Sequence, residues 1–289
     1  KNLIFAGNFN MTNLDDLFQV LVDLGQSPKE KSDTVTILEK VGHFLDEENS
    51  RIYNKYSNTI KRKEISNKIE DEIDLKIVLE NSFKDFDGGY ALAGLVGHGS
   101  SFVARDPSGI RPLYYYANDE IVVATSERPP IKTAFQCKFS EINEIDPGHA
   151  LIVNKDGSYS IKKFIDTKDK KACSFERIYF SRGNDPDIYK ERKKLGKFLV
   201  PQILDAIDDD IKNTIFSYIP NTAETCFYGM IEGLKDYVVD KKKKRFIDNK
   251  SFNGSENDLI SLKIRMEKLI SKDVKMRTFI TDDNSRNEL

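Results

Sequence analysis

The 289-residue sequence is poor in the residues that several common classes of protein depend on. It has no tryptophan, and its three cysteines and three histidines are scattered, which excludes a disulfide framework and a complete zinc site. No apolar run approaches the roughly 20 residues of a membrane-spanning helix, and no signal-peptide pattern opens the chain. With 45 Lys and Arg against 47 Asp and Glu, the charge favours neither nucleic acid nor a membrane. We therefore expect a soluble protein of a reducing compartment, the cytoplasm.

The composition is that of an ordinary globular protein, with 32% charged and 39% hydrophobic residues. At about 150 residues per domain, the length predicts roughly two domains. The chain has no initiator Met, and its opening residues Lys1–Ala6 are predicted to lead directly into a buried strand. Because domains usually begin in exposed and dispensable segments, we expect this sequence to be an excised piece of a longer polypeptide.

Helices followed by short strands are predicted for the first half, an order typical of an α+β layered domain. Amphipathic helices are expected over residues 10–25 and from Ser32 onward, and a charged, solvated helix between residues 46 and 74. A hairpin turn is expected at residues 155–158. The predicted strands lie at residues 90–96, 101–104, 113–116, 121–125 and 150–153.

The second half has the pattern with which a parallel α/β domain begins. A polar stretch at residues 166–171 precedes a helix predicted over residues 189–207. A buried strand at 213–219 and a helix from Thr225 follow. The basic run Lys241–Arg245 is interpreted as part of a solvated loop that extends to Asp258, in preference to a nucleic-acid patch.

Three short segments could carry chemistry. Ala6–Asn10 places amides where a strand ends, which suits an oxyanion hole but also an ordinary turn. Asp33 lies at a helix start, where it could bind a ligand or serve as the N-cap. Ala104–Leu113 combines two Arg, an Asp, two Pro and a Gly, a composition that alone predicts a rigid, salt-bridged hairpin.

Taken together and in this order, four segments resemble the glutaminase domain of class II glutamine amidotransferases. The segments are Asn8–Asn13, Ser32–Thr34, Arg105–Leu113 and Ala124–Glu127. The resemblance implies an α+β four-layer αββα sandwich of the N-terminal-nucleophile hydrolase type. Within this class, the Arg-Asp-Pro-x-Gly-x-Arg-Pro-Leu turn is most similar to those of amidophosphoribosyltransferases and asparagine synthetases.

The second half favours the amidophosphoribosyltransferases, because the Ser-Gly-Gly-x-Asp-Ser loop of asparagine synthetases is absent from the sequence. The resemblance predicts a glutaminase domain at residues 1–165 and the beginning of an α/β type I phosphoribosyltransferase domain at 166–289. Residues 51–74 and 240–258 are expected to be insertions. The similar segments are Ala172–Arg182, Tyr189–Gly196, Ile219–Thr222 and Arg277–Ile280.

The resemblance implies a step of purine synthesis in which ammonia from glutamine displaces pyrophosphate from phosphoribosylpyrophosphate. The family's nucleophile is an N-terminal Cys, which here would lie upstream of Lys1. The family's Asp-Asp-Ser-x-x-x-Gly-Thr-Thr phosphate loop is also absent from the sequence. We therefore expect this 289-residue chain alone to catalyse neither half-reaction.

Four site residues follow from the resemblance. Asn8 matches the oxyanion-hole amide, and Phe9 stands where the family has Gly and contributes its backbone N–H. A Phe there predicts strain if the backbone keeps a glycine-like φ. Asp33 matches the carboxylate that pairs with the α-ammonium of glutamine, and Arg277 matches an Arg of the loop that closes over phosphoribosylpyrophosphate.

The implied partners are glutamine, phosphoribosylpyrophosphate and further copies of the chain in a homo-oligomer, without nucleic acid or membrane. No metal or cofactor is expected in this piece, although Mg²⁺ would accompany phosphoribosylpyrophosphate in the full enzyme. Cys173 stands where some members have an iron–sulfur ligand, but a buried structural thiol is the preferred interpretation. The alternatives are a catalytically dead, glutaminase-like binding module and an enzyme similar to asparagine synthetase.

Overall fold

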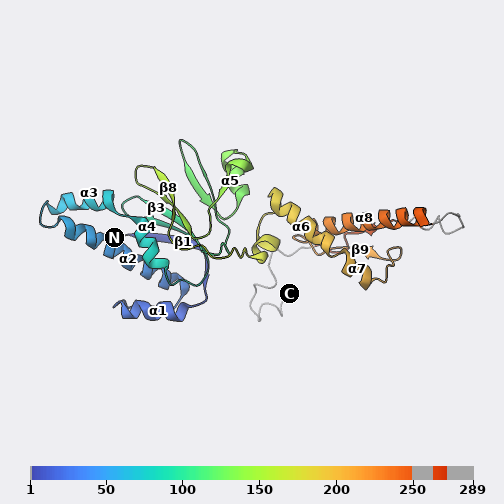
Figure 1. Ribbon diagram of the computed structural model, residues 1–289, viewed down its shortest axis with the longest axis horizontal. Coiled ribbons are helices and arrows are strands. Elements are labelled where there is room, and N and C mark those ends of the chain that lie inside the picture. The colour runs from blue at the N-terminus through green and yellow to red at the C-terminus, as the bar shows by residue number, and fades with distance from the viewer. Residues whose placement is uncertain (1, 249–262, 272–289) are drawn as a thin grey trace. The chain divides into compact units, whose positions relative to one another are not determined.

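The computed structural model describes residues 2–248 and 263–271. The chain forms two compact units, one ending at Glu176 and the other beginning at Arg177 (Figure 1). This division lies beyond the predicted domain boundary at residue 165, because the segment that follows the boundary is bonded to the first unit. The backbone N–H groups of Lys168, Lys171 and Cys173 donate to the carbonyl oxygens of Pro107, Ser108 and Ile110.

The first unit consists of helices followed by short strands, as the sequence predicted. The predicted solvated helix at 46–74 is in fact divided between the end of α2 and all of α3, and α3 buries Ile65. The elements are β1 (Leu3–Met11), α1 (Leu14–Asp23), α2 (Asp33–Tyr56), α3 (Arg62–Glu72), α4 (Leu75–Phe83), β2 (Gly88–Val96), β3 (Ser101–Arg105), β4 (Tyr114–Ala117), β5 (Val122–Thr125), α5 (Arg128–Phe135), β6 (Asn143–Glu144), β7 (His149–Val153) and β8 (Tyr159–Lys163).

The main sheet of this unit is antiparallel, with the spatial order β1-β2-β3-β7-β8. β1 pairs with β2 along its whole length, from Leu3 opposite Val96 to Met11 opposite Gly88. Within the described part of the chain, β1 has a neighbouring strand on one side only, so its other edge is open. A second sheet has the order β5-β4-β6. The predicted hairpin is confirmed, because residues 155–158 connect β7 to β8.

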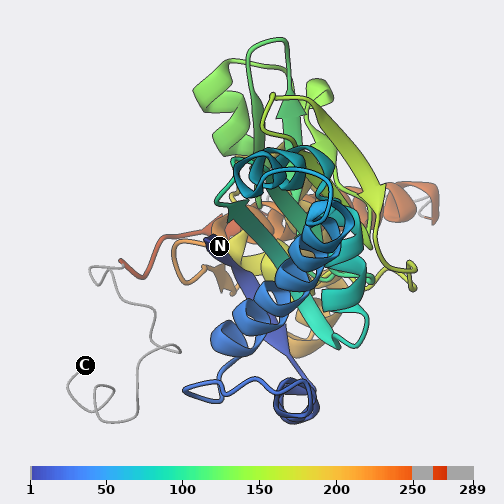
Figure 2. The same ribbon diagram turned by 90° about the vertical axis from the view of Figure 1, so that its left-hand side faces the viewer.

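Figures 1 and 2 show the helices and sheets of the first unit, which three apolar clusters hold together. Helices α2 and α4 pack on one face of the main sheet, where Ile37, Leu79 and Leu92 are buried. The opposite face packs on the smaller sheet around Leu151. Helix α5 packs on the smaller sheet through Ile131. Burial of both faces of the central strands β2, β3 and β7 explains why these strands are rich in apolar residues.

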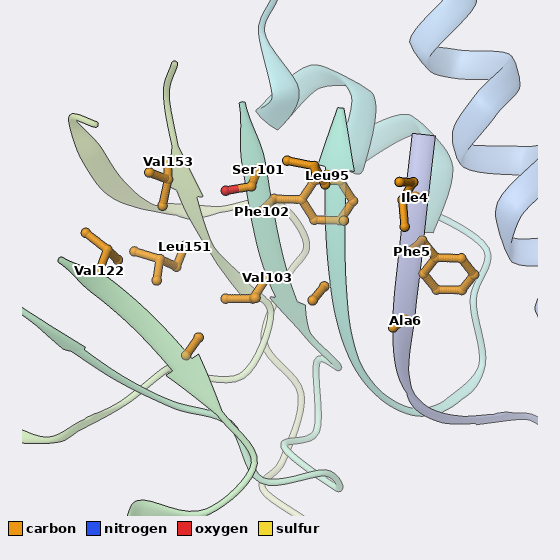
Figure 3. Close-up of a pocket in the computed structure, with 13 residues that line it drawn as sticks. Ile4, Phe5, Ala6, Leu95, Ser101, Phe102, Val103, Val122, Leu151 and Val153 are labelled. Carbon is orange, nitrogen blue, oxygen red and sulfur yellow. The ribbon is translucent and has the colours of Figure 1, made fainter. Parts of the chain in front are cut away.

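The face of the main sheet toward the smaller sheet is covered unevenly. Ile4 of β1 and Leu95 of β2 are 68% and 48% exposed, and they line an open apolar cavity of about 330 Å³ (Figure 3). Phe5 and Phe9 of β1 pack instead against the helix-covered core. Side chains alternate along a strand, so Asn8 projects from the same uncovered face as Ile4.

The second unit is built on two closely packed helices. A π-helical turn (Glu176–Phe180) begins at the last residue of the first unit. The other elements are α6 (Pro186–Phe198), α7 (Val200–Ala206), β9 (Ile215–Phe216), α8 (Glu224–Asp248) and β10 (Arg265–Met266). A Cβ on Gly196 of α6 would lie 1.8 Å from the Cys226 carbonyl oxygen, and one on Gly229 of α8 would lie 1.9 Å from that of Lys193. Glycine is therefore required at both positions of this helix contact.

Two sequence predictions for this unit are wrong in detail. The single helix predicted over residues 189–207 is interrupted at Leu199, because Pro201 fits only the first turn of a new helix. The basic run Lys241–Arg245 belongs to α8 and not to a loop. No Gly or Pro interrupts residues 234–248, and Lys241 is anchored by a 3.3 Å ion pair to Asp209. The predicted strand is short, but β9 pairs with β10 in the parallel sense that the sequence indicated.

Candidate active site

Asn8 and Phe9 lie inside β1, whereas the sequence placed them where a strand ends. The strand continues because Gly88 and Gly89 extend β2 and pair with Met11 and Asn10. Phe9 does not adopt a positive φ, so the strain predicted for a Phe at this position is absent. Its ring stacks on that of Phe5 at a centroid distance of 5.6 Å, on the core side of the sheet.

The backbone N–H of Phe9 is directed to the open edge of the main sheet. The neighbouring ladder bonds fix this direction: Gly97 N–H donates to Asn2 at 2.7 Å, and Thr12 N–H donates to Asp87 at 2.9 Å. Even-numbered residues of this segment therefore face β2, and hydrogen-bonding directions alternate along an antiparallel strand. The N–H of Met11 faces away from β2, as expected, and donates to Asp33 Oδ2 at 2.9 Å.

Asp33 is brought to the same edge as Phe9. It is the first residue of α2 and does not serve as its N-cap, because Ser32 is the N-cap and accepts from Val35 N–H at 3.4 Å. The carboxylate of Asp33 reaches Met11 instead. Two residues of a strand span about 6.6 Å, so the Asp33 carboxylate lies roughly that far along the edge from the Phe9 N–H. The structure thus brings together three of the four predicted site residues.

The side chain of Asn8 is held by a residue that the sequence did not indicate. Its amide Nδ2 donates to Glu176 Oε1 at 3.1 Å. The same carboxylate oxygen accepts from Arg111 Nη1 at 2.6 Å. Glu176 is only 8% exposed, although 168 residues separate it from Asn8 in the sequence. Sequence spacing gave no signal for this contact, because the segment around Glu176 was interpreted only as a connection between domains.

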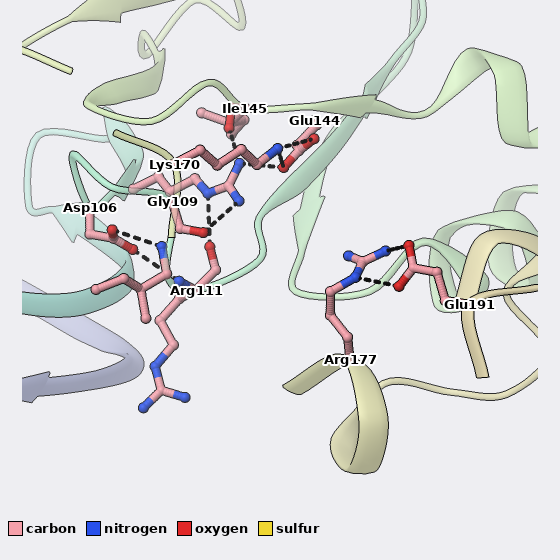
Figure 4. Close-up of polar contacts among 10 residues, drawn as sticks. Asp106, Gly109, Arg111, Glu144, Ile145, Lys170, Arg177 and Glu191 are labelled. Atoms are coloured by element: carbon pink, nitrogen blue, oxygen red, sulfur yellow. Dashed lines mark hydrogen bonds and ion pairs between the residues drawn. The ribbon is translucent and has the colours of Figure 1, made fainter. Parts of the chain in front are cut away.

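Asp106 organises the turn that follows β3. Its Oδ1 accepts from the N–H groups of Ser108 and Ile110 at 3.0 and 2.9 Å. Its Oδ2 accepts from Arg111 N–H at 3.0 Å (Figure 4) and, at 3.4 Å, from Tyr90 N–H. Asp106 is fully buried, and burial also raises the pKa of the neighbouring Tyr90 phenol. Asp106 thus bonds backbone N–H groups, and the guanidinium groups of the two arginines form their ion pairs with Glu144 and Glu176 instead.

Arg105 fixes the other side of this turn. Its guanidinium is 2% exposed and donates to Glu144 at 2.7 Å and to the carbonyl oxygens of Ile145 and Gly109 at 2.6 and 3.3 Å (Figure 4). Burial alone would raise the pKa of Glu144, but the hydrogen bonds and positive charges of Arg105 and Lys170 together outweigh burial, so the pKa is lowered from its ordinary value. The Arg111 side chain extends away from the turn and is available to Glu176 (Figure 4).

The remaining predictions concern residues away from this edge. Arg277 lies outside the described residues. Cys173 is half-buried, so the expectation of a buried thiol is wrong, because the segment that carries it lies on the surface. In the described ranges, no group of three or more His, Cys, Asp or Glu side chains could hold a metal ion. No helix in the described part of the chain is long and apolar enough to span a bilayer.

Sequence comparisons connect this chain with glutamine amidotransferases. Residues 47–133 match the family described as a glutamine amidotransferase domain. An amidophosphoribosyltransferase of Bacillus subtilis (strain 168) is 27% identical over 73% of this chain and 38% of its own length. One of Archaeoglobus fulgidus is 26% identical over 97% of this chain and 55% of its own length.

The fold is also similar to that of a solved structure. A glutamine phosphoribosylpyrophosphate amidotransferase from B. subtilis, solved in complex with ADP and GMP, superposes with a TM-score of 0.58 at 23% identity. The superposition covers 99% of this chain and 50% of that one. The chain is thus similar to amidophosphoribosyltransferases, and it spans about two-fifths to just over half of the length of the first four of these proteins.

Proposed function

We propose that this relative of the amidophosphoribosyltransferases belongs to an enzyme that hydrolyses glutamine and transfers the ammonia to phosphoribosylpyrophosphate, giving phosphoribosylamine for purine synthesis. The observation that carries the proposal is the arrangement at the open edge of β1. There the Asn8 amide, the Phe9 N–H and the Asp33 carboxylate lie along one strand. The two hydrogen-bond donors suit the side-chain carbonyl of glutamine, and the carboxylate suits its α-ammonium group.

The spacing along this edge suits glutamine in an extended conformation. Four bonds separate its α-nitrogen from its side-chain carbonyl carbon, which is roughly 5 Å when extended. The donors of Asn8 and Phe9 would stabilise the oxyanion that forms when the carbonyl is attacked. The Asp33 carboxylate, about 6.6 Å along the strand, would pair with the α-ammonium.

In the proposed mechanism the attacking group is the thiolate of an N-terminal Cys in the complete protein, with the α-amine as its base. The first unit is then a four-layer αββα sandwich of the N-terminal-nucleophile type. The successive contacts of α2 and α4, the two sheets and α5 support this assignment. In this mechanism the nucleophile and its base come from the N-terminal Cys, whereas the oxyanion donors lie on β1 and the Asp33 carboxylate that would bind the substrate ammonium lies on α2.

The second unit would begin the transferase domain and use the ammonia. Its strand β9, the loop that follows and helix α8 have the order of a phosphate-binding strand-turn-helix unit. Glu224 at the start of α8 accepts from the hydroxyls of Tyr218 and Tyr228 at 3.1 and 3.0 Å, which fixes the end of this loop. Arg277 would close over phosphoribosylpyrophosphate.

Mg²⁺ would enter this enzyme as the counter-ion of phosphoribosylpyrophosphate. The described residues form no cluster of three or more potential ligands, so we assign none of them to the ion. The enzyme would act in the reducing cytoplasm, a location compatible with the free thiols of Cys137, Cys173 and Cys226. We also propose a homo-oligomer, an assignment that rests on the sequence resemblance alone.

The test is an assay of the protein expressed from its complete reading frame. Glutamate release from glutamine and formation of phosphoribosylamine from phosphoribosylpyrophosphate would be measured together. We expect both activities. Hydrolysis with amide transfer to aspartate would support the asparagine-synthetase alternative, and absence of hydrolysis despite glutamine binding would support the inactive binding module.

A further inference from the structure

Glu176 connects the edge of β1 with the rigid turn after β3. One of its oxygens accepts hydrogen bonds from both Asn8 and Arg111. The backbone of Arg111 is itself fixed, since its N–H donates to Asp106 at 3.0 Å and its carbonyl accepts from Arg105 at 2.8 Å. The turn therefore fixes the backbone from which the Arg111 guanidinium reaches the Glu176 carboxylate, and this carboxylate limits the position of the Asn8 amide.

The contact has a direct chemical consequence for Asn8. A side-chain amide nitrogen carries two hydrogens, and only one is used by Glu176. The bond defines which end of the amide carries the donor and leaves the second hydrogen for a ligand. Without Glu176, rotation of the amide would place its carbonyl oxygen where a donor is needed, which would repel a developing oxyanion.

Arg111 compensates the negative charge that the Glu176 carboxylate places next to the Asn8 amide. An uncompensated negative charge next to an oxyanion would raise the energy of the transition state. Arg111 lies 2.6 Å from the same oxygen and offsets the charge of Glu176. The Nε of Arg111 is buried without a hydrogen-bond partner among the described residues, so no other described group competes for the guanidinium at that nitrogen.

We infer that Glu176 is a positioning residue for glutamine hydrolysis, which orients the Asn8 amide while Arg111 neutralises its charge. This inference rests on the proposed glutaminase function. It adds to that function a residue from the end of the first unit, and its peptide bond continues into the second unit at Arg177. Arg177 faces a different partner, because its guanidinium donates to Glu191 of the second unit (Figure 4).

The experiment measures kcat and KM for glutamine hydrolysis by the complete protein. We expect Glu176→Ala to lower kcat by about tenfold to a hundredfold with KM changed less than about threefold, since a donor is misoriented and not removed. Glu176→Gln keeps an acceptor for Asn8 and should lose less than Glu176→Ala. The double variant Asn8→Ala/Glu176→Ala should be no slower than Asn8→Ala alone, because Glu176 acts only through Asn8.

Removing the charges of Arg111 and Glu176, singly and together, tests the role of Arg111. Arg111→Gln leaves the Glu176 charge uncompensated and should lower kcat more than Glu176→Gln does. Removing both charges in Glu176→Gln/Arg111→Gln should recover part of that loss. The matched control is Glu48→Ala: Glu48 is 4% exposed and is bound by Arg51 through two 2.7 Å hydrogen bonds, so its loss should lower the melting temperature without changing kcat.

The outcomes separate the two proposals. If the unmodified protein does not hydrolyse glutamine, the proposed function fails. If it is active and Asn8→Ala lowers kcat but Glu176→Ala and Glu176→Gln do not, the role of Glu176 is wrong while the function stands. Additive losses in the double variant would also contradict a role through Asn8. If Glu176→Ala does not fold, the kcat values of Arg111→Gln and of Glu176→Gln/Arg111→Gln test the role of Glu176. A double variant that recovers none of the kcat lost in Arg111→Gln would contradict it.

Discussion

The turn after β3 and the end of β1 use their polar groups in opposite ways. In the turn, Arg105 and Asp106 are 2% and 0% exposed and bond to groups of the protein itself. On β1, Asn8 lies on an uncovered face and the Phe9 N–H is directed to an open edge. Polar groups that are satisfied internally stabilise a fold, whereas those directed outward are free to bind a ligand.

The turn and the Asn8-Phe9 pair both carry the sequence resemblance to class II glutamine amidotransferases, but they have different roles in the structure. The Arg-Asp-Pro-Ser-Gly-Ile-Arg-Pro-Leu turn is the more distinctive sequence, but it is a scaffold. The less distinctive Asn8-Phe9 pair carries the proposed chemistry. We therefore expect the loss of Asp106 in the turn to reduce stability and the loss of the Asn8 or Asp33 side chain at the edge of β1 to reduce activity.

The largest effect is expected for Asp106→Ala. Four backbone N–H groups would lose a buried, charged acceptor, which we expect to cost about 3–5 kcal/mol in the free energy of unfolding. Urea unfolding of the complete protein measures the change. The control is Asp156→Ala, in which an exposed Asp accepts from Ser158 in a similar turn, and its effect should be much smaller. Equal losses would contradict the scaffold role.

Asp33→Asn should affect substrate binding far more than stability. The Asn side chain can still accept from Met11 N–H, but it loses the charge that would pair with an ammonium. We expect KM for glutamine to rise about tenfold to a hundredfold with the melting temperature nearly unchanged. Asp74→Asn serves as control, because Asp74 caps α4 and Asn caps equally well. An unchanged KM in Asp33→Asn would remove Asp33 from the site.

Phe9→Ala separates the role of the Phe9 ring from that of its backbone N–H. The Phe9 ring is partly buried on the core side, so its loss should cost about 1–2 kcal/mol of stability. The backbone N–H stays in place, and kcat for glutamine hydrolysis should change by less than about threefold. A large loss of kcat in protein that remains folded would show that the ring, and not only the backbone, serves the reaction.

The smallest effect is expected from acid titration of the turn. The pKa of Glu144 is lowered from 4.5 in the folded protein, so its stabilising contribution is present above that value and is lost as the pH falls through the folded pKa. Because the side chain is 38% exposed, solvent screening limits the effect to about 0.5–1 kcal/mol. Unfolding free energies measured from pH 6 to pH 3 should fall less steeply in Glu144→Gln. Parallel curves would contradict this coupling.

Much of the fold could be predicted because local patterns determine it. The amphipathic stripes of α1 and α2, the short strands from Tyr90 onward and the hairpin between β7 and β8 were predicted from periodicity and turn residues. The errors arose where a local signal was overlooked or overridden. Pro201 interrupts an apolar pattern that predicted one continuous helix. The charged run Lys241–Arg245 was interpreted as a loop, although the absence of Gly and Pro permits the helix that is observed.

The candidate site was only partly predictable. Asn8, Phe9 and Asp33 could be selected from the resemblance, but their common edge follows from the β1–β2 register, which no local pattern specifies. Glu176 could not be found in this way. Its partners lie 65 and 168 residues earlier in the chain, and such contacts exist only once the sheets have formed.

The central claim is that the edge of β1 holds the oxyanion donors of a glutaminase. Its most direct test compares Asn8→Ala with Asn10→Ala, an exposed Asn two residues further along the same strand, in glutamine hydrolysis by the complete protein. We predict that Asn8→Ala lowers kcat by about 10²–10³ without loss of stability and that Asn10→Ala changes kcat by less than about threefold. Equal kcat values in the unmodified protein and in Asn8→Ala would contradict the claim.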